Sequence, residues 1–361
     1  MNNKEKIIKD YIDKNLTSNK AGYINEKYNE VKDLLSKNGY NKIFISGSLA
    51  RGTSIKPIND IDIICEIDKE KRNEYKFNEN KNIEYLSYLE EIYNILKDRY
   101  GEKNVKLQSH SIGILFNNKD DFSIDIVPAV KLNETNLDFG DNLYEVPEIL
   151  FIIHSNRKEF YKNKYNNHRN IDWKKTDPKG YINKAKEVEL INDNFIYASI
   201  FLKKWKQVVK EEKSKFLKSF HIEEYIKNKV IVNNNFGLID LLEEIQNINL
   251  HNPIIPDRAN HTINIDDYLK EDDFIKEIKN ISDRIDIFIS SIKKIQLIEE
   301  NQLEKFLNDF FDNITNNKHL KQNEPIKINK PWSNNLDKKV SEEKLLLLDD
   351  EIDFLKKKAL K

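Results

Sequence analysis

Two hydrophobic spacings divide the chain into a mixed first half and a helical second half. In the first half, segments with apolar residues three or four positions apart are predicted helices: 4–16, 18–39 and 82–98. Segments with period-two alternation or a short apolar run are predicted strands: 42–46, 60–67, 104–109, 111–117 and 122–127. The first half is therefore expected to form a sheet with flanking helices.

Helical spacing takes over after about residue 175. Thr176-Asp-Pro places a cap and a proline at a helix start. The predicted helices that follow are 178–192, 194–212, 219–229, 237–248, 267–295 and 300–313. Residues 316–361 are highly charged, with one apolar patch at Leu345–Leu348, which predicts a linker and a terminal helix.

This order of elements predicts an α+β fold with two domains and a tail. Residues 1–175 would form a catalytic domain with N-terminal helices, and residues 176–315 a helical domain that closes a nucleotide cleft. Residues 316–361 would be the charged C-terminal tail.

Charge and cysteine content narrow the classes of function. The 60 Lys and Arg residues nearly cancel the 61 Asp and Glu residues, so the chain as a whole has no strong attraction for nucleic acid. The single cysteine, Cys65, excludes an intrachain disulfide and lies in an apolar run, so we expect a core residue in an intracellular protein. Neither a signal peptide nor a membrane span is evident, and we expect a cytoplasmic location.

A pair of carboxylates marks the strand predicted at 60–67. Asp60 and Asp62 are two positions apart, so both side chains point to one face of the strand. Like charges on a rigid strand repel each other, and a hard divalent cation with oxygen ligands relieves that repulsion. Mg²⁺ suits such a site when phosphates share its coordination.

Two other segments supply what a phosphoryl-transfer site needs. Gly47 lets the backbone approach a ligand closely, and Ser48 offers a hydroxyl and a backbone N–H to phosphate oxygens. Asp125 lies among apolar residues of the strand at 122–127, where an unpaired carboxylate would be costly. We therefore expect Asp125 to join a metal site.

Each of these signals is weak by itself, since an isolated Asp-x-Asp is usually a solvated strand face or a turn. The combination is specific: a Gly-Ser turn, then Asp-x-Asp on the next strand, then an aspartate inside a later apolar strand. This combination indicates a nucleotidyltransferase site. Arg51 and Thr53, in the loop after the Gly-Ser turn, could assist phosphates or only shape the loop.

The arrangement resembles the polymerase-β-like nucleotidyltransferase superfamily, and within it the bacterial cyclic GMP-AMP synthase/DncV-like nucleotidyltransferases. The resemblance covers about residues 40–315. C-terminal to the Asp-x-Asp strand, the resemblance rests on five segments: Asp125-Ile-Val-Pro-Ala, Trp173-Lys-Lys-Thr-Asp-Pro-Lys-Gly-Tyr181, Phe201-Leu-Lys-Lys-Trp-Lys206, Ser219-Phe-His-Ile-Glu223 and Pro253-Ile-Ile-Pro-Asp-Arg-Ala-Asn260. The resemblance implies a mixed twisted sheet with flanking helices, followed by a C-terminal helical domain.

The resemblance also implies roles for particular residues. Gly47 and Ser48 would contact the triphosphate of a bound nucleotide. Asp60 and Asp62 would bind two Mg²⁺ ions, for which Mn²⁺ could substitute. Asp125 would complete one metal site and help activate the attacking ribose hydroxyl.

Two residues of the helical half would hold the distal phosphates, namely Lys203 and Ser219. Chemistry supports them independently, because a lysine suits phosphate and Ser219 begins a predicted helix, whose N-terminus attracts anions. The alternatives are that Lys203 lies on a solvated face beside Lys204 and Lys206, and that Ser219 is only a helix cap.

The function implied is a bacterial synthase of a cyclic nucleotide second messenger, which joins ATP, alone or with another NTP, and releases pyrophosphate. Its role would be antiphage signalling through a separate effector protein activated by the product. Alternatives are a nucleotidyltransferase that modifies tRNA, a protein or an antibiotic, and an inactive nucleotide-binding scaffold. Neither nucleic acid nor a membrane is expected as a partner.

Overall fold

The computed structural model describes residues 3–17, 21–58, 60–78, 83–108, 111–116, 122–135, 142–149, 171–210 and 214–316. Residues Met1–Asp312 form one compact unit and Asn313–Lys361 a second. The predictions made for the tail beyond residue 316, including the patch at Leu345–Leu348, lie outside the described residues. The predicted domain boundaries stay a prediction.

A seven-stranded mixed sheet lies at the centre of the first half, in the order β1-β2-β7-β6-β5, with β8 paired to β7 and β9 to β8. Its strands are β1 (Ile43–Ile45), β2 (Asp60–Ile67), β5 (Val105–Leu107), β6 (Ile112–Phe116), β7 (Phe122–Thr135), β8 (Asn142–Ile149) and β9 (Ile171–Thr176). Only β2 and β7 pair in parallel; the other pairs of this sheet are antiparallel. The mixed sheet confirms the predicted α+β class.

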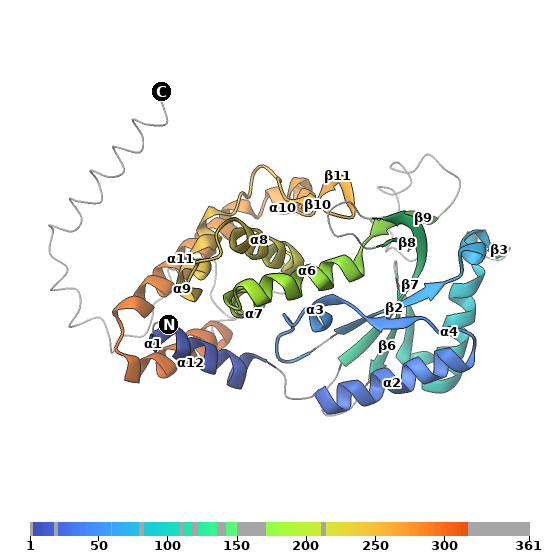
Figure 1. Cartoon of the computed structure of the whole chain (residues 1–361), viewed down its shortest axis with the longest axis horizontal. Helices are drawn as coiled ribbons and strands as arrows, with labels where there is room; N and C mark the ends of the chain where they lie inside the picture. The colour runs from blue at the N-terminus through green and yellow to red at the C-terminus, as the bar shows by residue number, and fades with distance from the viewer. Residues whose placement is uncertain are drawn as a thin grey trace, which may run out of the picture. The chain divides into compact units, whose positions relative to one another are not determined.

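One face of the sheet is covered by α2 (Ala21–Lys37) and α4 (Ser87–Tyr100), which run along it in Figure 1. The side chains of Ile61, Ile63 and Cys65 point into the core on this face, where they are fully buried. The strand alternation therefore turns Asp60 and Asp62 to the opposite face. Burial confirms that Cys65 is a core residue, and it raises the pKa of the thiol to about 12.

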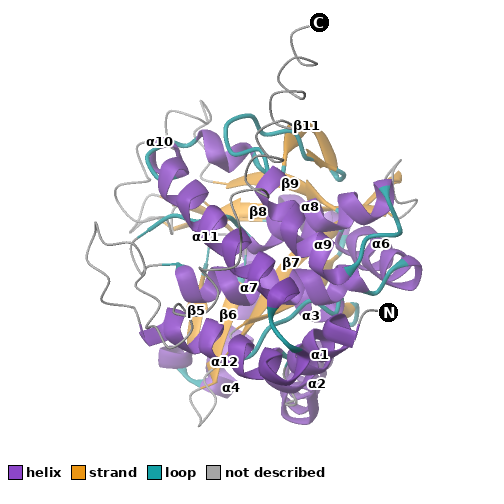
Figure 2. Ribbon diagram, turned by 90° about the vertical axis from the view of Figure 1, so that its left-hand side faces the viewer, coloured by secondary structure: helices purple, strands orange, loops and turns teal. Residues whose placement is uncertain are grey.

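In the described residues from 178 to 316, the elements are helices apart from the short hairpin β10 (Pro256–Asp257) and β11 (Asn260–Asn264). Its helices are α6 (Pro178–Ile191), α7 (Asn194–Val209), α8 (Ser219–Val232), α9 (Leu238–Glu243), η5 (Glu244–Asn247), η6 (Asp267–Lys270), α10 (Asp272–Ile275), α11 (Ile278–Leu297) and α12 (Glu300–Asn316). In Figure 2, α7, α9 and α11 lie in front of the strands. Trp205 is a core anchor of this half, packed on Phe216 and Phe288.

The N-terminal segment, α1 (Asn3–Tyr11) and η1 (Ile12–Leu16), packs on helices from the end of the described chain. The ring of Tyr11 stacks on that of Phe311 at 6.1 Å, and Lys4 Nζ donates to the carbonyl oxygen of Gln296 at 2.7 Å. These contacts tie the first helix to α11 and α12, not to the sheet.

Several elements differ from the pattern-based prediction. The expected helix at 82–98 begins as strand β4 (Ile83–Leu86), which pairs with β3 (Tyr75–Asn78), and becomes α4 at Ser87. The single helix expected at 267–295 is divided into η6, α10 and α11. Strands β8 and β9 were not predicted, and the expected loop after Gly47 begins with a short helix, α3 (Gly47–Ala50).

Strand β7 continues past Pro128, where the sequence pattern predicted an end at residue 127. Proline cannot donate a ladder hydrogen bond and usually ends or edges a strand. Here the β6 pairing stops at Ile126 and the β8 pairing starts at Val130. Pro128 lies between them, so the proline occupies a gap in the ladder on that side of β7.

Candidate active site

Two of the predicted carboxylates are brought side by side by the parallel pair β2 and β7. The register sets Asp62 opposite Asp125, and Asp60 is two residues earlier on the same face of β2. Residues in register on adjacent strands project to the same side of a sheet. The three carboxylates therefore share one face, opposite the core covered by α2 and α4.

Asp62 and Asp125 have raised pKa values, in part because of the neighbouring carboxylates. Burial, and then the charge of Asp60, raise the pKa of Asp62 above its usual range, against the opposing effect of Arg51. Burial, and then the charges of Asp62 and Asp60, raise the pKa of Asp125 to about 6, while a hydrogen bond from Gln108 lowers it. Negative charge is thus concentrated at a partly buried spot, which favours binding of a cation.

The same residues do not form a ready-made cage. Within the described part of the chain, no group of three His, Cys, Asp or Glu side chains is placed to hold one metal ion. Mg²⁺ is usually bound by one or two carboxylates together with substrate phosphates and waters, and seldom by an all-protein cage. The in-register oxygen donors Asp62 and Asp125 fit that mode of binding.

Gly47 is packed directly against Asp62 of this pair. It is the first residue of α3, has φ +67°, and a Cβ built on it would overlap the carboxylate of Asp62. The backbone N–H of Ser46 donates to the carbonyl oxygen of Asp62 at 2.8 Å, which fixes the approach. The lack of a side chain at Gly47 is therefore required by the protein itself.

Ser48 is the second residue of α3 and lies beside the carboxylates because of its neighbour. The first residues of a helix have N–H groups without partners inside the helix. Such groups, with the serine hydroxyl, can bind phosphate oxygens. The structure thus brings Gly47 and Ser48 together with Asp60, Asp62 and Asp125.

Lys203 occupies a buried ionic network instead of an open surface. Its Nζ donates to the carbonyl oxygen of Thr53 at 2.6 Å and lies 3.6 Å from Glu223 Oε2. Glu223 also accepts a hydrogen bond from Thr53 Oγ1 at 2.7 Å and pairs with the guanidinium of Arg51. Lys203 is 4% exposed, so the solvated-face alternative does not hold.

The charges of this network depend on one another. Burial alone would raise the pKa of Glu223, but Arg51 and Lys203 hold it below its usual range. Burial lowers the pKa of Lys203, and the charge of Glu223 only partly offsets that effect. Glu223 thus joins the loop after the Gly-Ser turn to helices α7 and α8, and sequence reasoning gave it no role. The only sequence feature that could have pointed to Glu223 was its place in the segment Ser219-Phe-His-Ile-Glu223, on which the resemblance rests.

Ser219 lies at the first turn of α8, where its Oγ accepts a hydrogen bond from Lys206 Nζ at 2.8 Å. Burial, and then the charges of Lys210, Lys203 and Lys218, lower the pKa of Lys206 to about 8. A buried ammonium group among like charges favours an anion nearby. Lys206 is thus the lysine that contacts Ser219, a contact that the sequence analysis did not predict.

A second buried polar group supports the start of α8. The hydroxyl of Tyr268 accepts a hydrogen bond from the backbone N–H of Lys218 at 2.8 Å and is hydrogen-bonded to Nδ1 of His221, also at 2.8 Å. Within the described residues, Nε2 of His221 has no hydrogen-bond partner, and it lies 4.0 Å from Asp266. This cluster fixes the backbone just before Ser219.

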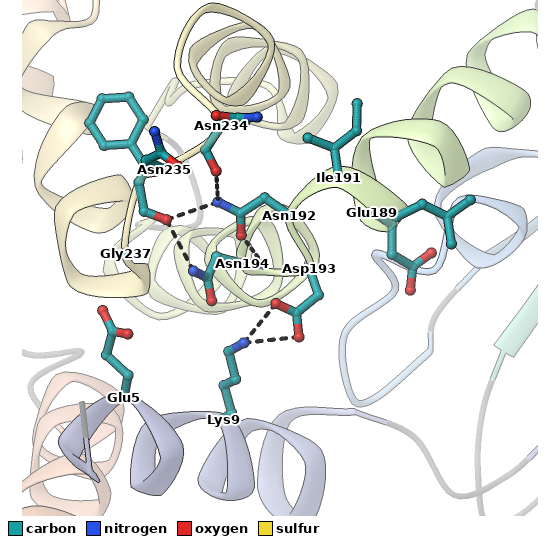
Figure 3. Close-up of a pocket in the computed structure, with 12 residues that line it drawn as sticks. Glu5, Lys9, Glu189, Ile191, Asn192, Asp193, Asn194, Asn234, Asn235 and Gly237 are labelled. Atoms are coloured by element: carbon teal, nitrogen blue, oxygen red, sulfur yellow. Dashed lines mark hydrogen bonds and ion pairs between the residues drawn. The ribbon is translucent and has the colours of Figure 1, made fainter. Parts of the chain in front are cut away.

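Two surface cavities lie away from the carboxylates. One, of about 510 Å³, is lined by residues that join α1, the α6–α7 turn and the α8–α9 turn, among them Lys9, Asn192 and Asn194. In it Lys9 pairs with Asp193 at 2.8 Å, and Asn192 donates to backbone oxygens of the α8–α9 turn (Figure 3). The other, of about 210 Å³, lies beside Lys42 and Glu66. The carboxylates, and not the cavities, mark the candidate site.

A comparison with protein families matches the segment that holds the carboxylates. Residues 2–147 match the family model of the Second Messenger Oligonucleotide or Dinucleotide Synthetase domain. The matched residues contain the Gly-Ser turn and all three carboxylates, and the match ends before α6. The predicted resemblance to DncV-like nucleotidyltransferases and the predicted enzyme class are confirmed. Synthesis of a nucleotide second messenger, the predicted function, gives the family its name.

Solved structures share the fold beyond the synthetase domain. Escherichia coli MS115-1 CdnC, solved with ATP, has a TM-score of 0.57 and 15% identity, covering 85% of this chain and 97% of its own. Bradyrhizobium diazoefficiens CdnG, solved with GTP, has a TM-score of 0.59 and 10% identity, covering 87% and 98%. Vibrio cholerae DncV cyclic AMP-GMP synthase, solved with nonhydrolyzable GTP, has 0.50 and 12%, covering 77% and 70%. At these identities the likeness shows the fold alone.

A search of the curated proteins found no match to this sequence. None of the helices in the described ranges is long and apolar enough to cross a bilayer.

Proposed function

We propose that the protein joins NTPs into a cyclic nucleotide second messenger, with Asp60, Asp62 and Asp125 as the catalytic carboxylates. The observation that carries the proposal is the parallel register that sets Asp62 opposite Asp125, with Gly47 packed on Asp62. The matched synthetase domain spans this same group of residues.

The donor nucleotide would be held from both sides of the site. Gly47 and Ser48 would bind its triphosphate through backbone N–H groups and the serine hydroxyl. Ser219, together with Lys206, would bind the distal phosphates, since these two side chains meet at the start of α8. Lys203 would contribute positive charge from within its pairing with Glu223, and Asp60 lies near enough to influence its pKa.

Divalent metal use is general for this family, and the carboxylates present suit it. Asp60 and Asp62 would hold two Mg²⁺ ions, with Asp125 completing one site and Mn²⁺ as a possible substitute. Bound there, the ions would neutralise the triphosphate and stabilise the charge that develops in phosphoryl transfer.

The chemistry is an in-line displacement carried out twice. The ribose hydroxyl of an acceptor nucleotide attacks the α-phosphorus of the donor, Asp125 accepts the hydroxyl proton, and pyrophosphate leaves. A second displacement within the linear product closes the ring. ATP is the expected substrate, alone or with another NTP, and a separate effector in antiphage defence would respond to the product.

The test is product formation by the purified full chain. Each labelled NTP, alone and mixed, is incubated with the protein and Mg²⁺ or Mn²⁺, and the reaction is then treated with phosphatase. The mass of the phosphatase-resistant product is measured by mass spectrometry. A resistant cyclic product is expected. A product that requires added tRNA, protein or an aminoglycoside would contradict the proposal.

The carboxylates are tested in the same assay. Asp60→Asn and Asp125→Asn should each lower the rate by about 100-fold or more, because each removes a charge that acts on the transition state. Asp33→Asn changes an exposed carboxylate of α2, on the opposite face of the sheet, and should leave the rate unchanged. Full activity in both site variants would refute the assigned roles.

A further inference from the structure

Gln108 contacts the candidate site from the end of strand β5, and no role has been assigned to it. Its Nε2 donates a hydrogen bond to Oδ1 of Asp125 at 3.1 Å. Its backbone N–H donates to the carbonyl oxygen of Ser111 at 2.8 Å, across the turn between β5 and β6. The side chain is exposed, so burial does not account for its position.

The orientation of the Gln108 amide is determined by its two partners. An ionised carboxylate can only accept hydrogen bonds, so the NH₂ group must face Asp125. The other end of the amide, Oε1, accepts a hydrogen bond from the hydroxyl of Ser111 at 3.0 Å. Ser111 is 5% exposed, so this hydroxyl lies in a defined place. The three side chains form a directed chain from Ser111 through Gln108 to Asp125.

Gly113 leaves the space in which this chain is formed. It lies directly opposite Asp125 in the antiparallel register of β6 and β7. A Cβ built on Gly113 would be 2.5 Å from Nε2 of Gln108 and 2.9 Å from Oδ1 of Asp125. Real Cβ atoms do not approach so closely, so with any larger residue at position 113 the Gln108 amide or the Asp125 carboxylate must shift from its present place.

We propose that Gln108 is a positioning residue for Asp125. By engaging Oδ1, Gln108 fixes the rotation of the carboxylate and leaves Oδ2 for a divalent cation and the attacking hydroxyl. Carboxylates that bind metals are themselves held by hydrogen bonds, and loss of such a partner typically lowers metal affinity by about 10- to 100-fold. This inference rests on the function proposed above, since it takes Asp125 as a metal-binding residue.

The test measures Mn²⁺ binding to the full chain by electron paramagnetic resonance, without any turnover. Gln108→Leu has a similar volume but no donor, and it should weaken Mn²⁺ binding by about 10-fold. Gly113→Ala should do the same, because it blocks the contact while keeping Gln108. Ser111→Ala should have a smaller effect in the same direction. Gln207→Leu, on α7, changes a glutamine that accepts from Lys204 and should bind Mn²⁺ as the unaltered chain does.

A kinetic readout separates positioning from general damage to the fold. Gln108→Leu should lower kcat for nucleotide joining while KM for NTP changes less than about twofold, because the triphosphate contacts lie elsewhere. Gln108→Asn, with a shorter amide, should not restore kcat. An unchanged far-ultraviolet circular dichroism spectrum and unfolding midpoint would confirm that the variants fold.

The outcomes distinguish this inference from the proposed function. The inference is overturned if Gln108→Leu and Gly113→Ala bind Mn²⁺ like the unaltered chain while Asp125→Asn binds it weakly. It is also overturned if Asp125→Asn leaves Mn²⁺ binding unchanged. If the variants lose Mn²⁺ affinity as expected but the unaltered chain joins no nucleotides, the positioning role stands and the proposed function fails.

Discussion

Gly47 shows how a single residue serves both the fold and the site. Its importance was predicted from what a ligand needs, namely close approach of the backbone. The structure gives a second reason, because a side chain there would overlap the carboxylate of Asp62. The positive φ of +67° adds a backbone preference for glycine.

Gly47→Ala should abolish nucleotide joining, and Gly52→Ala is its matched control. Both glycines have positive φ, +67° and +75°, so both substitutions share the backbone cost of about 1 kcal/mol. At Gly52 the nearest atom to an added Cβ is 3.8 Å away, in Ile196, so nothing must move. Comparable product rates in the two variants, with both folded, would contradict the role of the Asp62 overlap.

His221 predicts a pH dependence of stability at the scale of one residue. Burial, and then the charge of Lys218, lower its pKa to about 4, against the opposing effect of Asp266, and the hydroxyl of Tyr268 faces its ring. Because this folded-state pKa lies below the ordinary value of 6.5, the unfolded chain binds more protons between pH 6.5 and 4.

The free energy of unfolding should therefore fall as pH decreases through that window, by at most about 1.4 kcal/mol per pH unit. Urea unfolding at pH 7, 6 and 5 measures the slope. His221→Gln keeps a hydrogen-bonding side chain but does not titrate, so its slope should be shallower. Equal slopes in the two proteins would exclude His221 as the source.

Among the elements, α8 connects the loop after the Gly-Ser turn to the helical half. It carries Ser219 at its first turn and Glu223 one turn later, where Glu223 holds Arg51, Thr53 and Lys203. These partners are about 20 and 170 residues away in sequence. No local pattern reports such a pairing, so the sequence could suggest Lys203 as a phosphate ligand but not its partner.

Glu223→Gln should destabilise the protein by about 3 kcal/mol or more, because it leaves two buried cations without their anion. Chemical unfolding measures the change in free energy. The control, Glu304→Gln, removes the partner of Lys14, and both of these side chains are largely exposed, at 58% and 72%. Its effect should stay below about 1 kcal/mol. A loss of similar size in both variants would contradict the structural role of Glu223.

The elements that the sequence predicted well are those with a strong local period. Strand β2 was predicted at its observed bounds because Ile61, Ile63 and Cys65 alternate with polar or less buried positions. The start of β7 was equally clear, whereas its continuation depends on a pairing gap at Pro128 that only the tertiary structure defines. Asp60 and Asp62 were proposed from their two-residue spacing after a Gly-Ser turn, and Asp125 because a charged residue in an apolar strand is costly, while Gln108 and Lys206 carry no such signal.

At the scale of the whole molecule, nucleotide binding should stabilise the first compact unit as one body. The proposed phosphate contacts come from α3 and α8, and the Glu223 network connects α8 to Arg51 and Thr53 directly after α3. ATP with Mg²⁺ at about 100 times its Kd should add about 2.7 kcal/mol to the free energy of unfolding.

Calorimetry of the full chain checks this expectation through the rise in Tm. AMP is the matched ligand without distal phosphates and should give a much smaller rise. Ser219→Ala should reduce the rise caused by ATP and leave that caused by AMP unchanged. An equal response to ATP and AMP would contradict phosphate binding at α8.

The parallel pairing of β2 and β7 also sets rules for altering the length of this chain. The two strands are joined by a long connection that itself contains β6, so only the parts of it outside helices and strands can change length while β2, β6 and β7 keep their alignment. Inside β7 the side chains alternate between the two faces of the sheet. One residue inserted before Asp125 would therefore turn its carboxylate toward the hydrophobic core and turn Ile124 or Ile126 away from the core. Only an insertion of two residues would keep each side chain on its present face of the sheet.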